Sequence, residues 1–145
     1  MGRPLPYDAD PRDIAPGVPE FDYISTGEAI DLAEDYLGRG LPFHAHEVFE
    51  ARWRCCPQDE RDLWRALAQM AAGFTHHGRG NARGTRALLA RAQVTIAAYD
   101  GEPVIDNGGR RIDFTALVAR LRRALADDDF DELIDEITGL PRDAS

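Results

Sequence analysis

A histidine and a glutamate one helical turn apart are the residues of this sequence best suited to metal or acid–base chemistry. His46 and Glu50 are four positions apart, which places both side chains on one face of an α-helix. The stretch His46-Glu47-x-x-Glu50 differs from the zinc-binding H-E-x-x-H helix in offering a carboxylate as its second ligand. His76, from the next predicted helix, would complete a set of two histidines and one carboxylate that suits zinc or iron.

Aromatic residues lie on the same side of this helix as His46 and Glu50. At about 100° per residue, both polar side chains fall inside an arc of aromatic residues formed by Phe43, Phe49 and Trp53. Because such an arc predicts the face that packs inward, we expect both polar side chains to be buried. His44 falls on the opposite side together with Arg52, and it is predicted to be a surface residue.

A buried polar cluster has a structural interpretation as well as a chemical one. Glu50 can orient His46, and Gln69 from the next helix can occupy the remaining hydrogen-bonding positions. We favour this interpretation, since buried polar groups are most often satisfied by one another. It predicts a non-catalytic structural or interaction module that has no cofactor and that contacts a protein partner or a second copy of the chain. The alternative is a metal- or anion-binding protein, such as a metal-dependent hydrolase, with its site between the second and third helices.

Three arginines surround a predicted helix start and form a second candidate site. Arg79, Arg83 and Arg86 lie around Asn81, which is a good N-cap for the fourth helix. Their spacing of four and three residues would let the guanidinium groups converge near free backbone N–H groups, an arrangement that suits an anion. A solvated face paired with nearby carboxylates explains the same residues more simply, and we favour that interpretation.

Apolar spacing and capping residues predict the helices that position these groups. The first helix is expected to begin after Ser25 and to end at Gly38. The others are expected from Leu41 to Cys55, from Pro57 or Gln58 to His77, from Asn81 to Tyr99, from after Asp113 or Thr115 to Leu125, and from Phe130 to Ile137. Ser25 and Glu28 form a capping box at the first start. No strand pattern of useful length is present, so we expect an all-α fold, a single-domain bundle of about five to six helices with mostly short connections. Residues 1–22 are predicted to be an irregular arm, residues 23–140 the bundle, and residues 100–109 a loop within it.

The composition limits the classes of partner. A net charge of −9 argues against general nucleic-acid binding and against binding to anionic membranes, because both favour basic surfaces. All 17 basic residues are arginine, which fits either a protein of a high-salt cytoplasm or a bias toward GC-rich codons. No run of 18 apolar residues and no apolar signal-peptide core is present, so a cytoplasmic protein is expected. Cys55 and Cys56 are adjacent, which matches neither a zinc knuckle nor a C-x-x-C pair, and we expect reduced packing residues.

Several of these residues together form a longer motif. The stretches AHEVFEARWR, ALAQMAAGFTHH and GRGNARG fit the pattern HE-x-x-E-x-x-W, then a glutamine in a Leu/Ala-rich helix, then a histidine and G-N-x-x-G. The matching residues are His46, Glu47, Glu50, Trp53, Gln69, His76, Gly80, Asn81 and Gly84. Over residues 30–97 the sequence resembles the domain of unknown function 309 family, which consists of small helical proteins of prokaryotes.

The resemblance implies a helical bundle and no assigned activity. One departure from the family pattern is that Ala66-Leu67-Ala68-Gln69 replaces the usual Gly-Leu-Ile-Gln. Since the motif joins polar residues of two helices, it also implies that Gln69 and His76 face the side of His46 and Glu50 rather than solvent.

Overall fold

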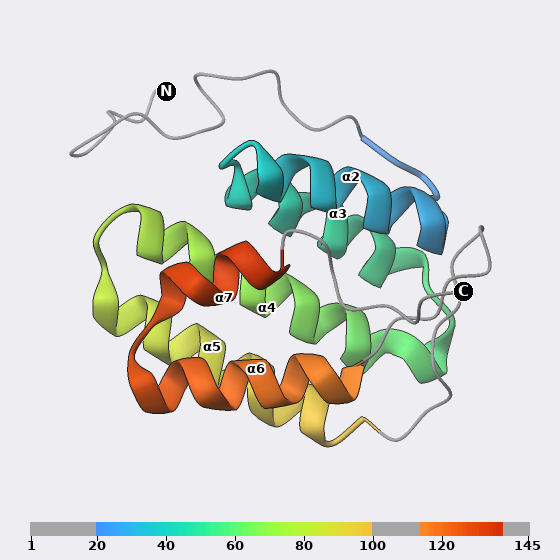
Figure 1. Ribbon diagram of the computed structural model, residues 1–145. Coiled ribbons are helices and arrows are strands. Elements are labelled where there is room, and N and C mark those ends of the chain that lie inside the picture. Colours follow the sequence, from blue (N-terminus) through green and yellow to red (C-terminus); the bar gives the residue numbers. More distant parts are fainter. Residues whose placement is uncertain (1–19, 100–113, 138–145) are drawn as a thin grey trace.

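The computed structural model describes residues 20–99 and 114–137, and this part of the chain is α-helical with no β-strand (Figure 1). The elements, in chain order, are α2 (Thr26–Gly38), α3 (Pro42–Cys55), a 3-10 helix (Gln58–Glu60), α4 (Arg61–Gly78), α5 (Ala82–Ala97), α6 (Phe114–Asp127) and α7 (Phe130–Ile137). The prediction of an all-α bundle is therefore confirmed. Most of the arm predicted at 1–22, and all of the loop predicted at 100–109, lie outside the described residues.

Capping residues start the helices at the predicted positions. The Ser25 hydroxyl accepts a hydrogen bond from the Glu28 amide (3.2 Å), and the Glu28 carboxylate accepts one from the Ser25 amide (3.1 Å). The Asn81 side-chain oxygen accepts a hydrogen bond from the Gly84 amide (2.9 Å) at the start of α5. Pro42 occupies the first turn of α3, where its missing N–H would have no helical partner. These contacts satisfy backbone groups that helix ends otherwise leave unpaired.

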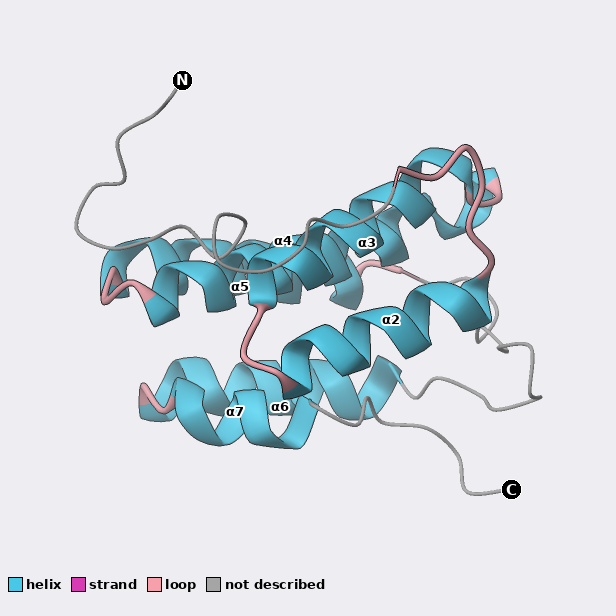
Figure 2. Cartoon of the chain, turned by 90° about the horizontal axis from the view of Figure 1, so that it is seen from above, coloured by secondary structure: helices cyan, strands magenta, loops and turns pink. Residues whose placement is uncertain are grey.

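Helix α4 is the centre of the bundle. It packs against α3 and α5, while α2 packs on α3, α6 packs on α5 and α7 packs on α4 and α6 (Figure 2). Ten of the 18 residues of α4 are buried, and they include an apolar stripe formed by Leu63, Leu67, Met70 and Phe74. Only a narrow strip of α4 stays accessible, and that strip carries Arg65 and Gln69.

The buried face of α3 differs from the predicted one. Its buried residues are His44, Ala45, Val48, Phe49, Ala51 and Arg52. His46 and Glu50 lie at the edge of this face, with side chains that are 19% and 43% exposed. The prediction that both are buried was wrong, because α3 contacts α2 as well as α4 and buries the side that lies between them.

His44 and Arg52, which the helical wheel placed on the outer side, are both buried. The His44 ring lies 5.1 Å from the ring of Tyr36 on α2, so the prediction of a surface histidine was wrong. The Arg52 guanidinium donates hydrogen bonds to the Ile24 carbonyl (3.0 Å) and to the Thr26 hydroxyl (3.0 Å) at the start of α2. Both side chains therefore contact α2 or the residues just before it.

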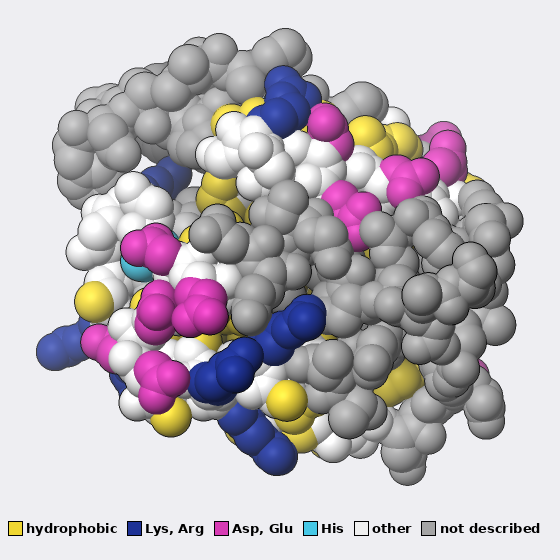
Figure 3. Space-filling model, in the orientation of Figure 1, with side chains coloured by type: hydrophobic (Ala, Val, Ile, Leu, Met, Phe, Trp, Pro, Cys, Tyr) yellow, Lys and Arg dark blue, Asp and Glu magenta, His cyan; other side chains and the backbone are white. Residues whose placement is uncertain are grey.

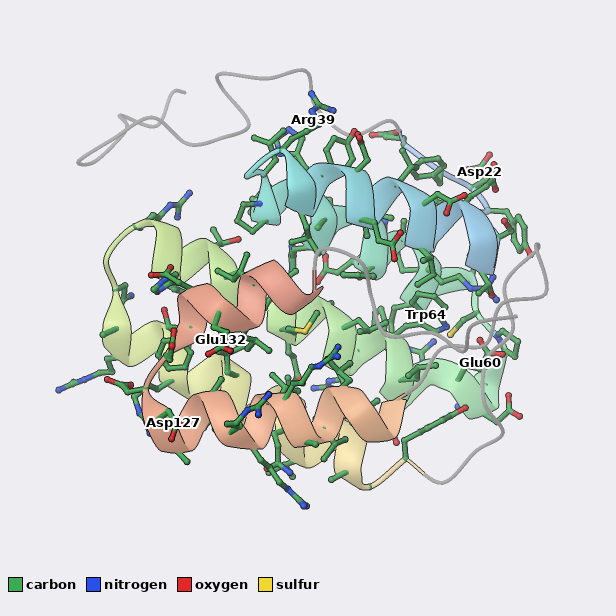
Figure 4. The ribbon with its side chains drawn as sticks, in the orientation of Figure 1. Asp22, Arg39, Glu60, Trp64, Asp127 and Glu132 are labelled. Atoms are coloured by element: carbon green, nitrogen blue, oxygen red, sulfur yellow. The ribbon has the colours of Figure 1, made fainter. Side chains whose placement is uncertain are left out.

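Arg52 also joins α3 to the start of α4. Its guanidinium lies 3.6 Å from the Glu60 carboxylate and 5.6 Å from the centre of the Trp64 ring. The Trp64 indole N–H donates a hydrogen bond to the same carboxylate (2.9 Å), and Figure 4 shows Glu60 and Trp64 beside each other. A buried arginine is tolerated here because both of its terminal NH₂ groups donate hydrogen bonds and its charge has a counter-ion.

Helices α6 and α7 are attached through polar contacts at the edge of α4 and α5. His77 Nε2 of α4 lies 2.8 Å from the Asp131 carboxylate of α7, and Arg86 of α5 donates to Asp128 (2.5 Å). Asp and Glu side chains gather over α7 and the turn before it (Figure 3).

Among the described helices, none combines the length and apolarity needed to span a membrane.

Candidate functional site

A pocket of about 340 Å³ lies where α3, α4 and α5 meet, and we refer to it as the three-helix pocket. Its lining residues are His46, Glu50 and Trp53 from α3, Arg65, Ala68, Gln69 and Ala72 from α4, and Leu88 and Arg91 from α5. None of the described residues of α2, α6 or α7 lines it. Among the described residues, the pocket is therefore formed by the three central helices.

Small residues on α4 create this space. Ala68 and Ala72 line the pocket, and neither has a side chain long enough to fill the gap between helices. Directly after Ala72, Gly73 lets α5 approach closely, since a β-carbon there would lie 3.0 Å from the Leu89 side chain. Trp53 forms an apolar wall, and its outer position is held by the Arg61 guanidinium, 4.2 Å from the ring centre.

Two arginines face the pocket from opposite helices. Arg65 of α4 and Arg91 of α5 also line a neighbouring hollow of about 410 Å³, together with Gln69. Both side chains are exposed, and neither makes an ion pair or hydrogen bond with a described residue. The two hollows thus form one groove along α4 and α5 in which the guanidinium donors are available to a ligand.

Gln69 lies in the middle of this groove with a fixed orientation. The Thr95 hydroxyl of α5 donates a hydrogen bond to Gln69 Oε1 (3.1 Å). Because the side-chain oxygen is engaged, the amide NH₂ is the part of Gln69 left to donate. Gln69 is partly buried, so this donor is held at the surface of the pocket.

His46 stands between two carboxylates at the rim of the pocket. Its Nε2 lies 3.4 Å from Glu50 Oε2, and its Nδ1 lies 3.9 Å from Glu47 Oε2. The Nδ1 atom is buried and has no hydrogen-bond partner among the described residues. One ligand atom from each of these three residues lies within 4.8 Å of the others, which is close enough for them to share a metal ion.

The second half of the sequence motif forms a turn between α4 and α5. His76 Nδ1 lies 3.0 Å from Asn81 Nδ2, and Asn81 also caps α5 through Gly84. Gly80, just before the cap, has a positive φ of 75°, which favours glycine. His76 therefore has a partner at the helix turn, and it lines neither hollow of the groove.

The arginines near Asn81 are partly engaged elsewhere. Arg86 donates to Asp128 and to the Leu125 carbonyl (3.1 Å), which directs it toward α6 and the turn before α7. Asn81 uses its side chain for the cap and for His76, while Arg83 is exposed on α5. An anion site formed by Arg79, Arg83 and Arg86 stays a prediction.

The two cysteines lie at the end of α3 and carry free thiols. The Cys55 thiol donates to the Ile24 carbonyl and the Cys56 thiol to the Trp53 carbonyl, both at 3.5 Å. Burial raises the pKa of the Cys56 thiol, and the positive charge of Arg52 opposes that shift. Both contacts agree with the predicted packing role.

The structure brings together three of the predicted polar residues, His46, Glu50 and Gln69, in one pocket. It also adds Arg65 and Arg91, which sequence reasoning missed. Arg65 lies one helical turn before Gln69, and that spacing was a usable signal. The sequence contains no such signal for Arg91, because its place in the pocket depends on how α5 packs on α4.

Comparison with known proteins identifies a family but no activity. Residues 30–88 match the family model described as "Domain of unknown function (DUF309)", which confirms the resemblance found in the sequence motif. Neither a curated protein nor a solved structure matches the chain.

Proposed function

We propose that the protein binds a small organic anion between α3, α4 and α5. The proposal is drawn from the pocket itself, because residues 30–88 belong to the DUF309 family, whose description names no activity. One observation carries the proposal. Arg65, Gln69 and Arg91 line the same two hollows, and neither guanidinium is paired with a described carboxylate. This proposal replaces a buried structural cluster as our preferred interpretation, because Glu50 is 43% exposed.

The donors in the groove suit a carboxylate or a similar oxyanion. A guanidinium offers several N–H groups in one plane, which match two oxygens of the same anion. Arg65 and Arg91 come from different helices, and Gln69 lines both hollows together with them. An anion bound there would give both arginines the counter-ion that the described residues do not supply.

The walls of the three-helix pocket suit an apolar body attached to that anion. Trp53, Leu88, Ala68 and Ala72 provide carbon surface, and the volume of about 340 Å³ is in the range of small-molecule sites. A flat ring can lie against Trp53 while its charged group points toward the arginines. Benzoate has this combination of a ring and one carboxylate, and it serves as the probe.

The expected affinity is low because the probe is small. Ligands of this size gain on the order of 0.5 kcal/mol per non-hydrogen atom, which for benzoate corresponds to a Kd of about 1 mM. Affinities of this order are measured by titration in nuclear magnetic resonance spectra of ¹⁵N-labelled protein.

The two tryptophans provide an internal comparison for this experiment. Trp53 lines the pocket, whereas Trp64 is fully buried and donates its indole N–H to Glu60. Benzoate is expected to shift the Trp53 indole resonance and to leave the Trp64 resonance in place. The two indole resonances are assigned with the variant Trp53→Phe, in which the Trp53 resonance is absent. Benzyl alcohol, which has the ring without the charge, is expected to cause a much smaller shift at equal concentration.

Arginine variants locate the anion. Arg65→Ala and Arg91→Ala should each weaken benzoate binding by about fivefold or more, since each removes a charged donor. Arg83→Ala makes the same change of charge on the exposed face of α5 and should leave the affinity unchanged. The proposal is wrong if the Trp53 resonance does not move, if benzyl alcohol acts as well as benzoate, or if only Arg83→Ala reduces binding.

A further inference from the structure

The groove along α4 and α5 also carries a negative charge that a simple anion would leave unused. Asp62, in the first turn of α4, lines the hollow of about 410 Å³ together with Arg65, Gln69 and Arg91. Resting on the anion site proposed above, we infer that the ligand is a zwitterion, namely an α-amino acid with an aromatic side chain. Its carboxylate binds the two arginines, its ammonium group binds Asp62, and its ring lies against Trp53.

Asp62 is the unpaired carboxylate of the groove. Its side chain is exposed and makes neither an ion pair nor a hydrogen bond with a described residue. The other carboxylate that lines the groove, Glu50, lies 3.4 Å from His46 Nε2. Among the described residues of the groove, Asp62 is therefore the carboxylate available to a cationic group of a ligand.

Asp62 and Arg65 lie on the same face of α4. They are three residues apart, and Gln69 follows four residues after Arg65, so the three side chains form one row along the helix. Opposite charges at this spacing often pair with each other. Asp62 and Arg65 form no ion pair in the structure although they line the same hollow. Each charge thus stays free to bind the opposite charge of a ligand.

An α-amino acid carries both of the charges that this hollow can bind. Its ammonium group is attached to the carbon next to the carboxylate, so a carboxylate held by Arg65 and Arg91 brings the ammonium group into the hollow that Asp62 lines. The ammonium group has three N–H donors, and the Asp62 carboxylate accepts from it in a charge-assisted hydrogen bond. The net charge of −9 favours the same ligand, since the protein as a whole repels a simple anion more than a zwitterion.

An aromatic side chain fits the adjoining three-helix pocket. Arg65, Gln69 and Arg91 line both hollows, so a group attached to the bound carboxylate and ammonium reaches the pocket directly. Trp53 and Leu88 provide carbon surface there. Phenylalanine is the simplest amino acid with such a ring, and it serves as the probe.

The test compares two probes that differ only in the ammonium group. L-Phenylalanine and 3-phenylpropanoate share the ring, the carboxylate and the carbon chain that joins them. Each is titrated into ¹⁵N-labelled protein near neutral pH in about 0.15 M NaCl, which screens distant charges, and the shift of the Trp53 indole resonance gives the Kd. We expect phenylalanine to bind at least about threefold more tightly, because its ammonium group gains a charge-assisted contact with an exposed carboxylate.

Asp62→Asn assigns the site of the ammonium group. The variant keeps the shape of the side chain and removes its charge, so the two probes should bind with about equal affinity. Asp62→Ser, with a side chain too short to reach the ligand, should give the same result in a second protein. Asp59→Asn is the matched control, because Asp59 is exposed, lies three residues earlier and lines neither hollow. It should keep the preference for phenylalanine.

The inference would be overturned if 3-phenylpropanoate bound the wild-type protein as tightly as phenylalanine, or if the preference persisted in both Asp62 variants. In either case the binding of 3-phenylpropanoate would still support the anion pocket, so the proposed function would stand. If neither probe shifted the Trp53 resonance, the anion pocket itself would be wrong, and the zwitterion site with it.

Discussion

Gly84 has no space for a side chain in the turn between α4 and α5. A β-carbon at this position would lie 2.8 Å from both Asn81 Nδ2 and His76 Nδ1. These are the two groups whose contact holds the turn, and Asn81 also caps the Gly84 amide. His76, Asn81 and Gly84 are thus explained by local folding.

Gly84→Ala is predicted to destabilise the protein even though alanine is the better helix former. Overpacking should lower the free energy of unfolding by about 1 to 3 kcal/mol. Gly78→Ala is the matched control, because no atom lies within 4 Å of its β-carbon position and its backbone has no positive φ. Urea denaturation of both variants tests this, and equal or higher stability of Gly84→Ala would contradict it.

At the residue scale, the sequence predicted the N-cap at Asn81 but not the lack of space for a side chain at Gly84. Asn81 was recognisable because an N-cap depends on neighbours in the sequence. The constraint on Gly84 depends on the ring of His76, which belongs to the preceding helix. The same division holds in the pocket, where Gln69 was predicted and Arg91 was not.

At the scale of elements, the helices were predictable and the orientation of α3 was not. The bounds of α2, α3, α4 and α5 follow from caps, prolines and apolar spacing. The wheel for α3 gave most weight to Phe43, Phe49 and Trp53, and of these only Phe49 is buried. His44 and Arg52 turn inward because α2 offers them partners, and a periodicity argument within one helix does not contain that information.

Arg52→Met is predicted to weaken the junction of α2, α3 and α4. The variant keeps an unbranched side chain but removes the charged donor, so that the Ile24 carbonyl keeps only the Cys55 thiol and the Glu60 carboxylate only the Trp64 indole. We expect the free energy of unfolding to fall by about 2 to 4 kcal/mol. Arg54→Met, an exposed position on the same helix, should change it little. Similar denaturation midpoints for the two variants would argue against the junction.

At the scale of the whole molecule, the sequence motif separates into two parts with different roles. His76, Gly80, Asn81 and Gly84 shape the α4–α5 turn, which also lies next to the contacts that attach α6 and α7. His46, Glu50, Trp53 and Gln69 line the three-helix pocket, which no described residue of α6 or α7 reaches. Substitutions in the first part should affect folding, and those in the second part should affect binding.

The free energy of unfolding of Glu50→Ala, measured by urea denaturation with a chelator present, tests this separation most directly. Its side chain is 43% exposed and its nearest partner, His46, is 3.4 Å away, so the contact is expected to contribute little to stability. We predict a value within about 0.5 kcal/mol of the wild type. A loss of about 2 to 4 kcal/mol, as expected for removal of a buried polar partner, would show that the cluster is structural and contradict its assignment to binding.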